Sequence, residues 1–236
     1  MQDLFDHSLT YKKTVFRNIF SIKNSQNLFD DLSDDENDWN NAIELERKTH
    51  PSLKNHSSIQ RGFDYSLNID FFEYPFQNIS ATKFSDGSFG AWYGSETLET
   101  TIYETAYRYI KMMQDTEGFT ESGSVTQPER RVGTVDCDGI AIDLSTKVND
   151  YPWLIDPIDY KMTQEVGRKV HKEVSLLRVQ SARCQEKNVV AFSPVPLNNP
   201  RDYCYLKYKA DFKKDSFIAY RGNKIILSLA ISDIVG

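Results

Sequence analysis

Hydrophobic positions recur with helical spacing in two segments of the chain. Within residues 97–113, apolar side chains return every three or four positions along one stripe, which is the pattern of a helix with one buried face. Met162, Val166, Val170 and Val174 repeat every four residues. Both segments are therefore predicted to be helices that pack an apolar face on a core.

A third helix is predicted closer to the N-terminus, over residues 33–48. This segment opens with Ser-Asp-Asp-Glu, a capping-box sequence in which the Ser and Glu side chains satisfy free backbone N–H groups. Trp39, Ile43 and Arg47 then recur every four residues, and Pro51 follows the expected end. The acidic first turn also suits the positive end of the helix dipole.

Shorter runs of β-branched, aromatic and other apolar residues predict the strands. The first is expected over residues 14–22, and a turn within 84–93 should lead into another. Apolar residues on both sides of Asp-Cys-Asp-Gly at 136–139 predict a hairpin, after a loop at 117–129. Further strands are predicted at 176–179, 189–192, 203–208, 217–220 and 225–231.

This order of elements predicts an α+β fold. The strands look antiparallel, and a doubly wound parallel sheet would alternate strand and helix more regularly. At 236 residues the chain is long enough for one sizeable core. The simplest interpretation is a single domain over residues 1–236, in which an N-terminal strand and helices (1–60) precede the core with the candidate site (61–236).

Charge and hydropathy narrow the classes of function. The formal net charge is −6 and the pI is about 5.3, so direct binding of DNA or RNA is not expected, because phosphate neutralisation needs clustered Lys and Arg. No run of 18 or more apolar residues occurs, and the N-terminus lacks the basic and apolar regions of a secretory signal. We therefore expect a cytoplasmic protein that does not enter a membrane.

Cysteine and histidine patterns give no support for a disulfide framework or a metal site. Cys137, Cys184 and Cys204 are widely spaced and form no C-x-x-C pair. The four histidines show no H-E-x-x-H spacing, and no Gly-rich phosphate loop of the Rossmann or Walker type occurs. Metalloenzyme, Rossmann and P-loop classes are therefore disfavoured.

Residues 81–107 contain three chemically distinctive positions. Lys83 precedes a short Phe-containing turn, Tyr93 ends the strand that follows, and Glu104 lies one helical turn past a Thr-Leu-Glu-Thr start. Their order, and their spacings of ten and eleven residues, resemble the core of the RES-domain family.

A second block, residues 179–192, resembles that family's Ser-x-Arg segment followed by an apolar strand. It places the family's serine on Ser181, two residues before Arg183. A weaker resemblance concerns Val-Phe-Arg in the first predicted strand. It places on Arg17 the first-strand arginine of this family and of the wider ADP-ribosyltransferase fold.

The resemblance implies an ADP-ribosyltransferase-like fold and an enzyme that uses NAD as its substrate. It implies a toxin that cleaves the nicotinamide–ribose bond and transfers the ADP-ribosyl group to phosphate or water. It also implies a RES-Xre toxin–antitoxin pair, in which an Xre-type helix-turn-helix antitoxin supplies the DNA contact, and a homodimer. With no metal-ligand spacing in the sequence, we expect the reaction to need no metal.

The residue types suit this chemistry. Loss of nicotinamide leaves an oxocarbenium-like cation, so the site needs a carboxylate near the sugar, cations at the pyrophosphate and an aromatic surface. The candidate catalytic residues are Glu104, Tyr93 and Ser181, and the candidate NAD-binding residues are Arg17, Lys83 and Arg183. Glu104 lies roughly 180° from the apolar stripe of its helix, so it is no core residue. Nothing near Ser181 in sequence suggests a hydrolase triad, so its expected role is a hydrogen bond to the substrate.

Other interpretations stay open. Glu104 could be a solvated helix glutamate, Tyr93 a packing residue and Ser181 a turn serine; Arg183 could form a structural ion pair. Lys83 departs from the family, which carries Arg at this position, and Arg can hold a phosphate bidentately whereas Lys is a flexible point charge. The alternative functions are ADP-ribosylation of a macromolecule, or a binding module with attenuated or no turnover.

Overall fold

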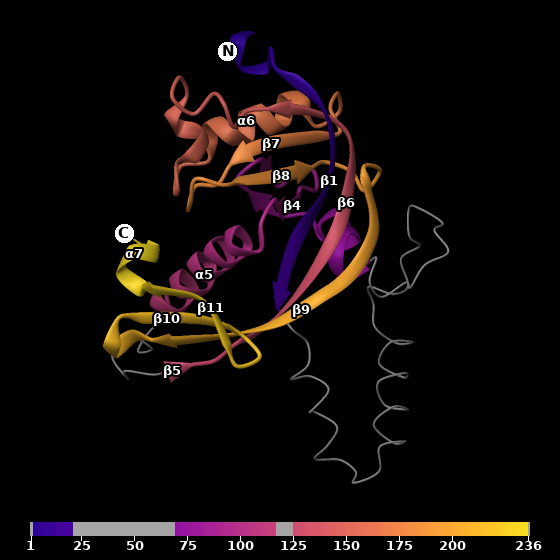
Figure 1. Cartoon of the computed structure of the whole chain (residues 1–236). Coiled ribbons are helices and arrows are strands. Elements are labelled where there is room, and N and C mark those ends of the chain that lie inside the picture. Colours follow the sequence, from indigo (N-terminus) through magenta and orange to yellow (C-terminus); the bar gives the residue numbers. More distant parts are fainter. Residues whose placement is uncertain (1, 21–68, 117–124, 236) are drawn as a thin grey trace.

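The computed structural model of the chain describes residues 2–20, 69–116 and 125–235 (Figure 1). The helix predicted over residues 33–48 lies outside these ranges. The described residues build one sheet of nine strands, with helices packed on it, and a separate two-stranded hairpin.

The elements have the following bounds. The strands of the large sheet are β1 (Ser8–Phe20), β4 (Trp92–Ser95), β5 (Val125–Thr126), β6 (Glu129–Asp143), β7 (Leu176–Gln180), β8 (Lys187–Ala191), β9 (Leu197–Asp211), β10 (Ser216–Arg221) and β11 (Lys224–Ala230). The small hairpin consists of β2 (Ala81–Thr82) and β3 (Ser85–Asp86). The α-helices are α4 (Tyr74–Gln77), α5 (Leu98–Gln114), α6 (Lys161–Val170) and α7 (Ile231–Val235). Short 3-10 or π turns cover Gln2–Phe5, Ile69–Glu73, Pro152–Ile155 and Phe212–Lys214.

Part of the large sheet closes on itself. Strands β1, β4, β8, β7 and β6 pair in this order, and β1 also pairs with β6. β1 runs antiparallel to β6 over its whole length, from Ser8 opposite Ile142 to Phe20 opposite Arg130. β6 and β7 are parallel, and beyond β6 the sheet continues through β9, β10 and β11 (Figure 1). This mixed sheet with flanking helices confirms the predicted α+β class.

Most predicted elements are present. The strand predicted over 14–22 is the end of the longer β1, and the five strands predicted toward the C-terminus correspond to β7 through β11. α6 confirms the second helix, although it ends at Val170, so Val174 lies beyond it. Its buried residues pack with β7 and β8 side chains in one cluster of the core.

The hairpin predicted at residues 136–139 is wrong, because β6 runs through them without a turn. Asp138 lies opposite Lys12 of β1 and forms an ion pair with it at 3.1 Å. Asp136 accepts hydrogen bonds from a threonine of β1 and an arginine of β9, whereas Cys137 between them is buried. The two aspartates therefore lie on one face of β6, with the buried Cys137 between them on the other face. Both aspartates are bonded to side chains of the neighbouring strands.

Helix α5 confirms the helix predicted over 97–113. The Thr97 side chain accepts a hydrogen bond from the backbone N–H of Thr100 at 3.2 Å, which satisfies a free donor of the first turn. The apolar stripe is fully buried at Ile102, Ala106 and Ile110. It packs with side chains of β6, β9, β10 and α7, and this packing fixes the rotation of the helix about its axis.

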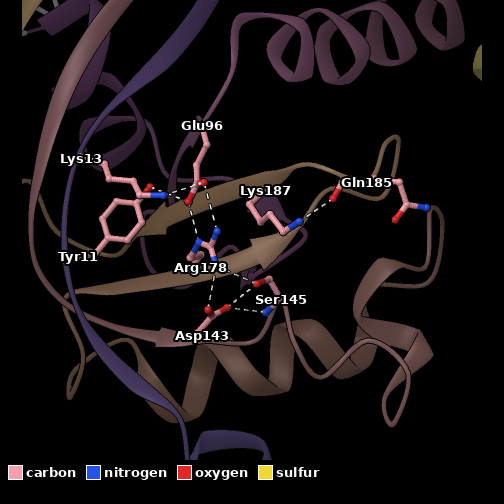
Figure 2. A network of polar contacts seen from close by, with 8 residues as sticks. All are labelled: Tyr11, Lys13, Glu96, Asp143, Ser145, Arg178, Gln185 and Lys187. Atoms are coloured by element: carbon pink, nitrogen blue, oxygen red, sulfur yellow. Dashed lines mark hydrogen bonds and ion pairs between the residues drawn. The ribbon is translucent and has the colours of Figure 1, made fainter.

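An ionic network anchors the start of α5 to the sheet (Figure 2). Arg178 of β7 donates to Glu96 at 2.7 Å and to Asp143, at the end of β6, at 2.9 Å. Lys13 and Tyr11 of β1 also donate to Glu96, both at 3.1 Å. Glu96 directly precedes the N-cap of α5. Side chains of β1, β6 and β7 in this network therefore fix the point where the helix begins.

The network keeps both carboxylates ionised. Burial opposes ionisation of both Glu96 and Asp143. Hydrogen bonds from Arg178 and Lys13 nevertheless hold the pKa of Glu96 below its ordinary range. Hydrogen bonds from Ser145 and Arg178 do the same for the pKa of Asp143. Asp143 is only 2% exposed, so it depends on its partners in place of water.

We expect Arg178→Met to lower the free energy of unfolding at pH 7 by about 3–5 kcal/mol, because it leaves a buried carboxylate without its cation. The two carboxyl pKa values are depressed in the folded state, so this loss should be full above about pH 4.5 and shrink as the pH falls further. Urea unfolding at several pH values measures it.

Arg201→Met is the matched control for this prediction. Arg201 also donates to an aspartate from a strand, but its side chain is 56% exposed, so its loss should cost less than about 1 kcal/mol. Equal effects of the two substitutions would contradict the anchoring role of Arg178.

Candidate active site around helix α5

The six candidate residues come from five different parts of the fold. Arg17 lies on β1, Tyr93 on β4 and Glu104 on α5. Lys83 occupies the turn of the β2–β3 hairpin. The connection from β7 to β8 carries Ser181 and Arg183. Contacts described below link all six into one connected group.

Glu104 contacts the β7–β8 connection directly. Ser181, which is 2% exposed, donates its hydroxyl hydrogen to Glu104 Oε1 at 2.7 Å. The same hydroxyl oxygen accepts the backbone N–H of Arg183 at 3.0 Å, which leaves its hydrogen for the carboxylate. The Glu104 carboxylate is therefore fixed by a hydrogen bond from the β7–β8 connection. The sequence alone had left open that it was a solvated helix residue.

Tyr93 fastens the turn that carries Lys83. Its hydroxyl accepts the backbone N–H of Phe84 at 2.9 Å and lies 2.9 Å from Thr82 Oγ1. Burial raises the pKa of Tyr93 to about 12, so the phenol is neutral at physiological pH. The geometry gives Tyr93 an anchoring contact and an aromatic surface, and it gives no support for a role as a base.

Lys83 and Arg183 are held by neighbouring backbone carbonyls. Lys83 Nζ donates to Asp156 O at 3.0 Å, and Arg183 Nη2 donates to Pro157 O at 3.1 Å. The Arg183 guanidinium also lies 3.2 Å from the ring centroid of Tyr107 on α5. Burial lowers the pKa of Lys83 to about 8, Arg183 contributes to the lowering, and Glu104 and Asp156 oppose it. Both cations thus reach the region of Glu104 while bonded to neutral acceptors.

Arg17 brings a further cation to the backbone of Tyr93. Its Nη1 donates to Tyr93 O at 2.7 Å, and its Nε is buried without a hydrogen-bond partner in the described part of the chain. Burial, then the positive charges of Arg108 and Arg130, lower the pKa of Arg17 to about 10. Since no described carboxylate bonds to this guanidinium, the local positive charge is uncompensated, which favours binding of an anion.

Sequence reasoning missed two residues of this group. Arg108 lies one helical turn after Glu104, on the same face of α5. Asn188, at the start of β8, donates to Glu104 Oε1 at 2.7 Å. The pairing of β8 with β4 brings Asn188 to the site, and no local pattern in the sequence announces that pairing.

The described residues contain no group of three or more His, Cys, Asp or Glu side chains that could hold a metal ion. In the same part of the chain, no helix has the length and apolar character needed to cross a membrane.

Comparison with known families gives a match. A model of the RES domain matches residues 58–211, which is more than half of the 236-residue chain. The chain belongs to the RES-domain family. The match includes every candidate residue except Arg17, and membership is consistent with an NAD-utilising enzyme in general. No curated protein matches the chain.

The pKa of Lys83 gives this RES-domain site an expected pH dependence. Below about pH 8 the amine is protonated and attracts an anion, and above it the amine is neutral. We expect the affinity for ADP-ribose, a pyrophosphate ligand, to fall as the pH rises through about 8. Calorimetric titration between about pH 6.5 and 9.5, roughly 1.5 pH units on either side of the Lys83 pKa, measures this fall.

Two matched substitutions test whether Lys83 causes it. Lys83→Arg should retain affinity at high pH, because a guanidinium stays protonated throughout this range. Lys161→Arg, at an exposed position on α6, should leave the parental pH dependence unchanged. A fall of equal size in all three proteins would assign the effect to another group.

Proposed function

We propose that this RES-domain protein cleaves the bond between nicotinamide and ribose in NAD and transfers the ADP-ribosyl group to phosphate or water. The observation that carries the proposal is a carboxylate, Glu104, held by Ser181 among cations that are bonded to neutral acceptors. NAD needs both signs of charge, because its pyrophosphate is an anion and its ribosyl group becomes a cation as the bond breaks.

Each residue has a role in this proposal. Lys83, Arg183 and Arg17 bind the pyrophosphate, and Tyr93 offers an aromatic surface beside them. The C–N bond breaks with its electron pair leaving on nicotinamide, and Glu104 stabilises the positive charge that develops on the ribosyl group. A phosphate oxygen, or water with loss of a proton, then forms the new bond to the same carbon.

The wider setting is also a proposal. The resemblance of the site blocks to RES-Xre systems supports an ADP-ribosyltransferase-like fold, a homodimer and a toxin role, and the sequence pattern supports a cytoplasmic location. A net charge of −6 supports an Xre-type antitoxin as the source of any DNA contact. An acidic antitoxin segment would complement the cations around Glu104.

Two alternatives differ in their products. A transferase acting on a macromolecule would leave labelled protein or nucleic acid, and a binding module would leave NAD intact. Lys83 supports the second alternative, because a Lys holds a pyrophosphate less specifically than the family's Arg. Incubating the protein with labelled NAD, with and without phosphate and cell lysate, separates these cases. We expect soluble ADP-ribosyl products that form faster in phosphate, with no need for added metal.

Glu104→Gln is expected to reduce NAD turnover by at least ~100-fold, because it removes the charge that stabilises the transition state. The ADP-ribose dissociation constant should change little, since the amide keeps the size of the side chain. Single-turnover rates and calorimetric titration measure the two quantities.

The control for that prediction is Glu99→Gln, at an exposed position of the same helix. It should turn over NAD at the parental rate. Parental turnover by Glu104→Gln with an unchanged melting temperature would show that the carboxylate has no catalytic part.

A further inference from the structure

A pair of buried polar side chains stands behind Glu104. Ser95, the last residue of β4, lies opposite Asn188 of β8 in the strand register. They are 5% and 8% exposed. Ser95 Oγ donates to Asn188 Oδ1 at 2.6 Å, and Asn188 Nδ2 donates to Glu104 Oε1 at 2.7 Å. The three side chains form a continuous chain of hydrogen bonds from the sheet to the helix.

This chain of hydrogen bonds has a fixed direction. The Glu104 carboxylate accepts from the Asn188 amide N–H, and the Asn188 carbonyl on the other side accepts from the Ser95 hydroxyl. A flipped amide would place its oxygen against the carboxylate and leave two acceptors facing each other. Because the carboxylate can only accept, the arrangement suits an ionised Glu104.

The two oxygens of Glu104 have different surroundings. Oε1 accepts from both Ser181 and Asn188. Within the described residues, Oε2 makes no hydrogen bond. Both donors to Oε1 are neutral, so they orient the carboxylate without compensating its charge. We propose that Asn188, itself oriented by Ser95, is a positioning residue that fixes Glu104 through Oε1 and presents the Oε2 edge to the substrate.

The neighbouring cations make such positioning necessary. Lys83 and Glu104 attract each other, since Glu104 acts to raise the Lys83 pKa against burial. A freely rotating glutamate could swing into an ion pair with a cation that the substrate's pyrophosphate needs. Two short hydrogen bonds to Oε1 oppose that movement and keep opposite charges apart before the substrate binds.

This inference rests on the proposed function, and its test uses three variants of the full chain. Asn188→Leu has a similar shape but no donor, so kcat should fall roughly 10- to 100-fold with a much smaller change in KM. Ser95→Ala leaves the Asn188 donor in place and removes only the hydrogen bond to its carbonyl, so its loss of kcat should be smaller. A kcat of Asn188→Leu equal to that of the parent would overturn the proposal.

Asn188→Asp adds a readout that a purely structural role would not move. It places a second carboxyl group against Glu104, and two carboxylates in contact cannot both ionise without cost. At acidic pH one shared proton restores a donor, and at alkaline pH the two charges repel. The rate of this variant relative to the parent should therefore rise as the pH is lowered from about 8.5 toward about 5, because such a pair takes up its shared proton above the ordinary carboxyl pKa. Parallel pH profiles would overturn the proposal.

Stability measurements separate this proposal from the proposed function. In the absence of NAD, Asn188→Asp should lower the melting temperature more at pH 8.5 than at pH 6, and adding Glu104→Gln should reverse most of that difference. If this coupling is measured but the parent does not turn over NAD, the proposed reaction is wrong, and the contact between Asn188 and Glu104 still stands. Turnover by the parent without the coupling would overturn the positioning role alone.

Discussion

The bridge that Arg178 forms between Glu96 and Asp143 is the constraint on which the rest of the site depends. It joins the end of β6, the middle of β7 and the residue just before the cap of α5 (Figure 2). A helix that starts at a fixed point and buries a fixed stripe has a fixed outer face. The face that carries Glu104, toward Ser181 and Asn188, is fixed with it, so an interaction outside the site sets where the Glu104 carboxylate can reach.

The protein uses its guanidinium groups in two different ways. Arg178 is paired with two carboxylates and contributes to folding. Arg17, Arg130 and Arg183 are bonded to carbonyl or amide oxygens, which accept hydrogen bonds without cancelling charge. In an acidic chain, these three guanidinium groups are thus left without a carboxylate partner within the described residues, and two of them, Arg17 and Arg183, belong to the candidate site. This difference separates the ions that stabilise the fold from those available to a ligand.

Sequence periodicity was sufficient for elements whose identity depends on local spacing. The stripe of α5 was readable because a helix repeats within a few residues. The hairpin prediction at 136–139 failed because Asp and Gly letters resemble a turn, while pairing with β1 and β9 kept β6 extended. Asn188 was missed for the same reason: its partner Ser95 is 93 residues away, and only strand register brings them together.

Lys83 stands where the resemblance to the family implies an arginine, and the difference between the two side chains affects how this site would bind an anion. A lysine has three donors, and here Asp156 O accepts one of them at 3.0 Å, which leaves two for an anion. Burial can remove its proton near physiological pH, which it cannot do to an arginine. A lysine lacks the planar, bidentate fork of arginine. In exchange, its expected attraction for a pyrophosphate falls when a modest rise in pH removes its proton. A binding site built on Arg17 and Arg183 alone would lack this response near pH 8, so the expected pH response belongs to the lysine that stands where the resemblance implies an arginine.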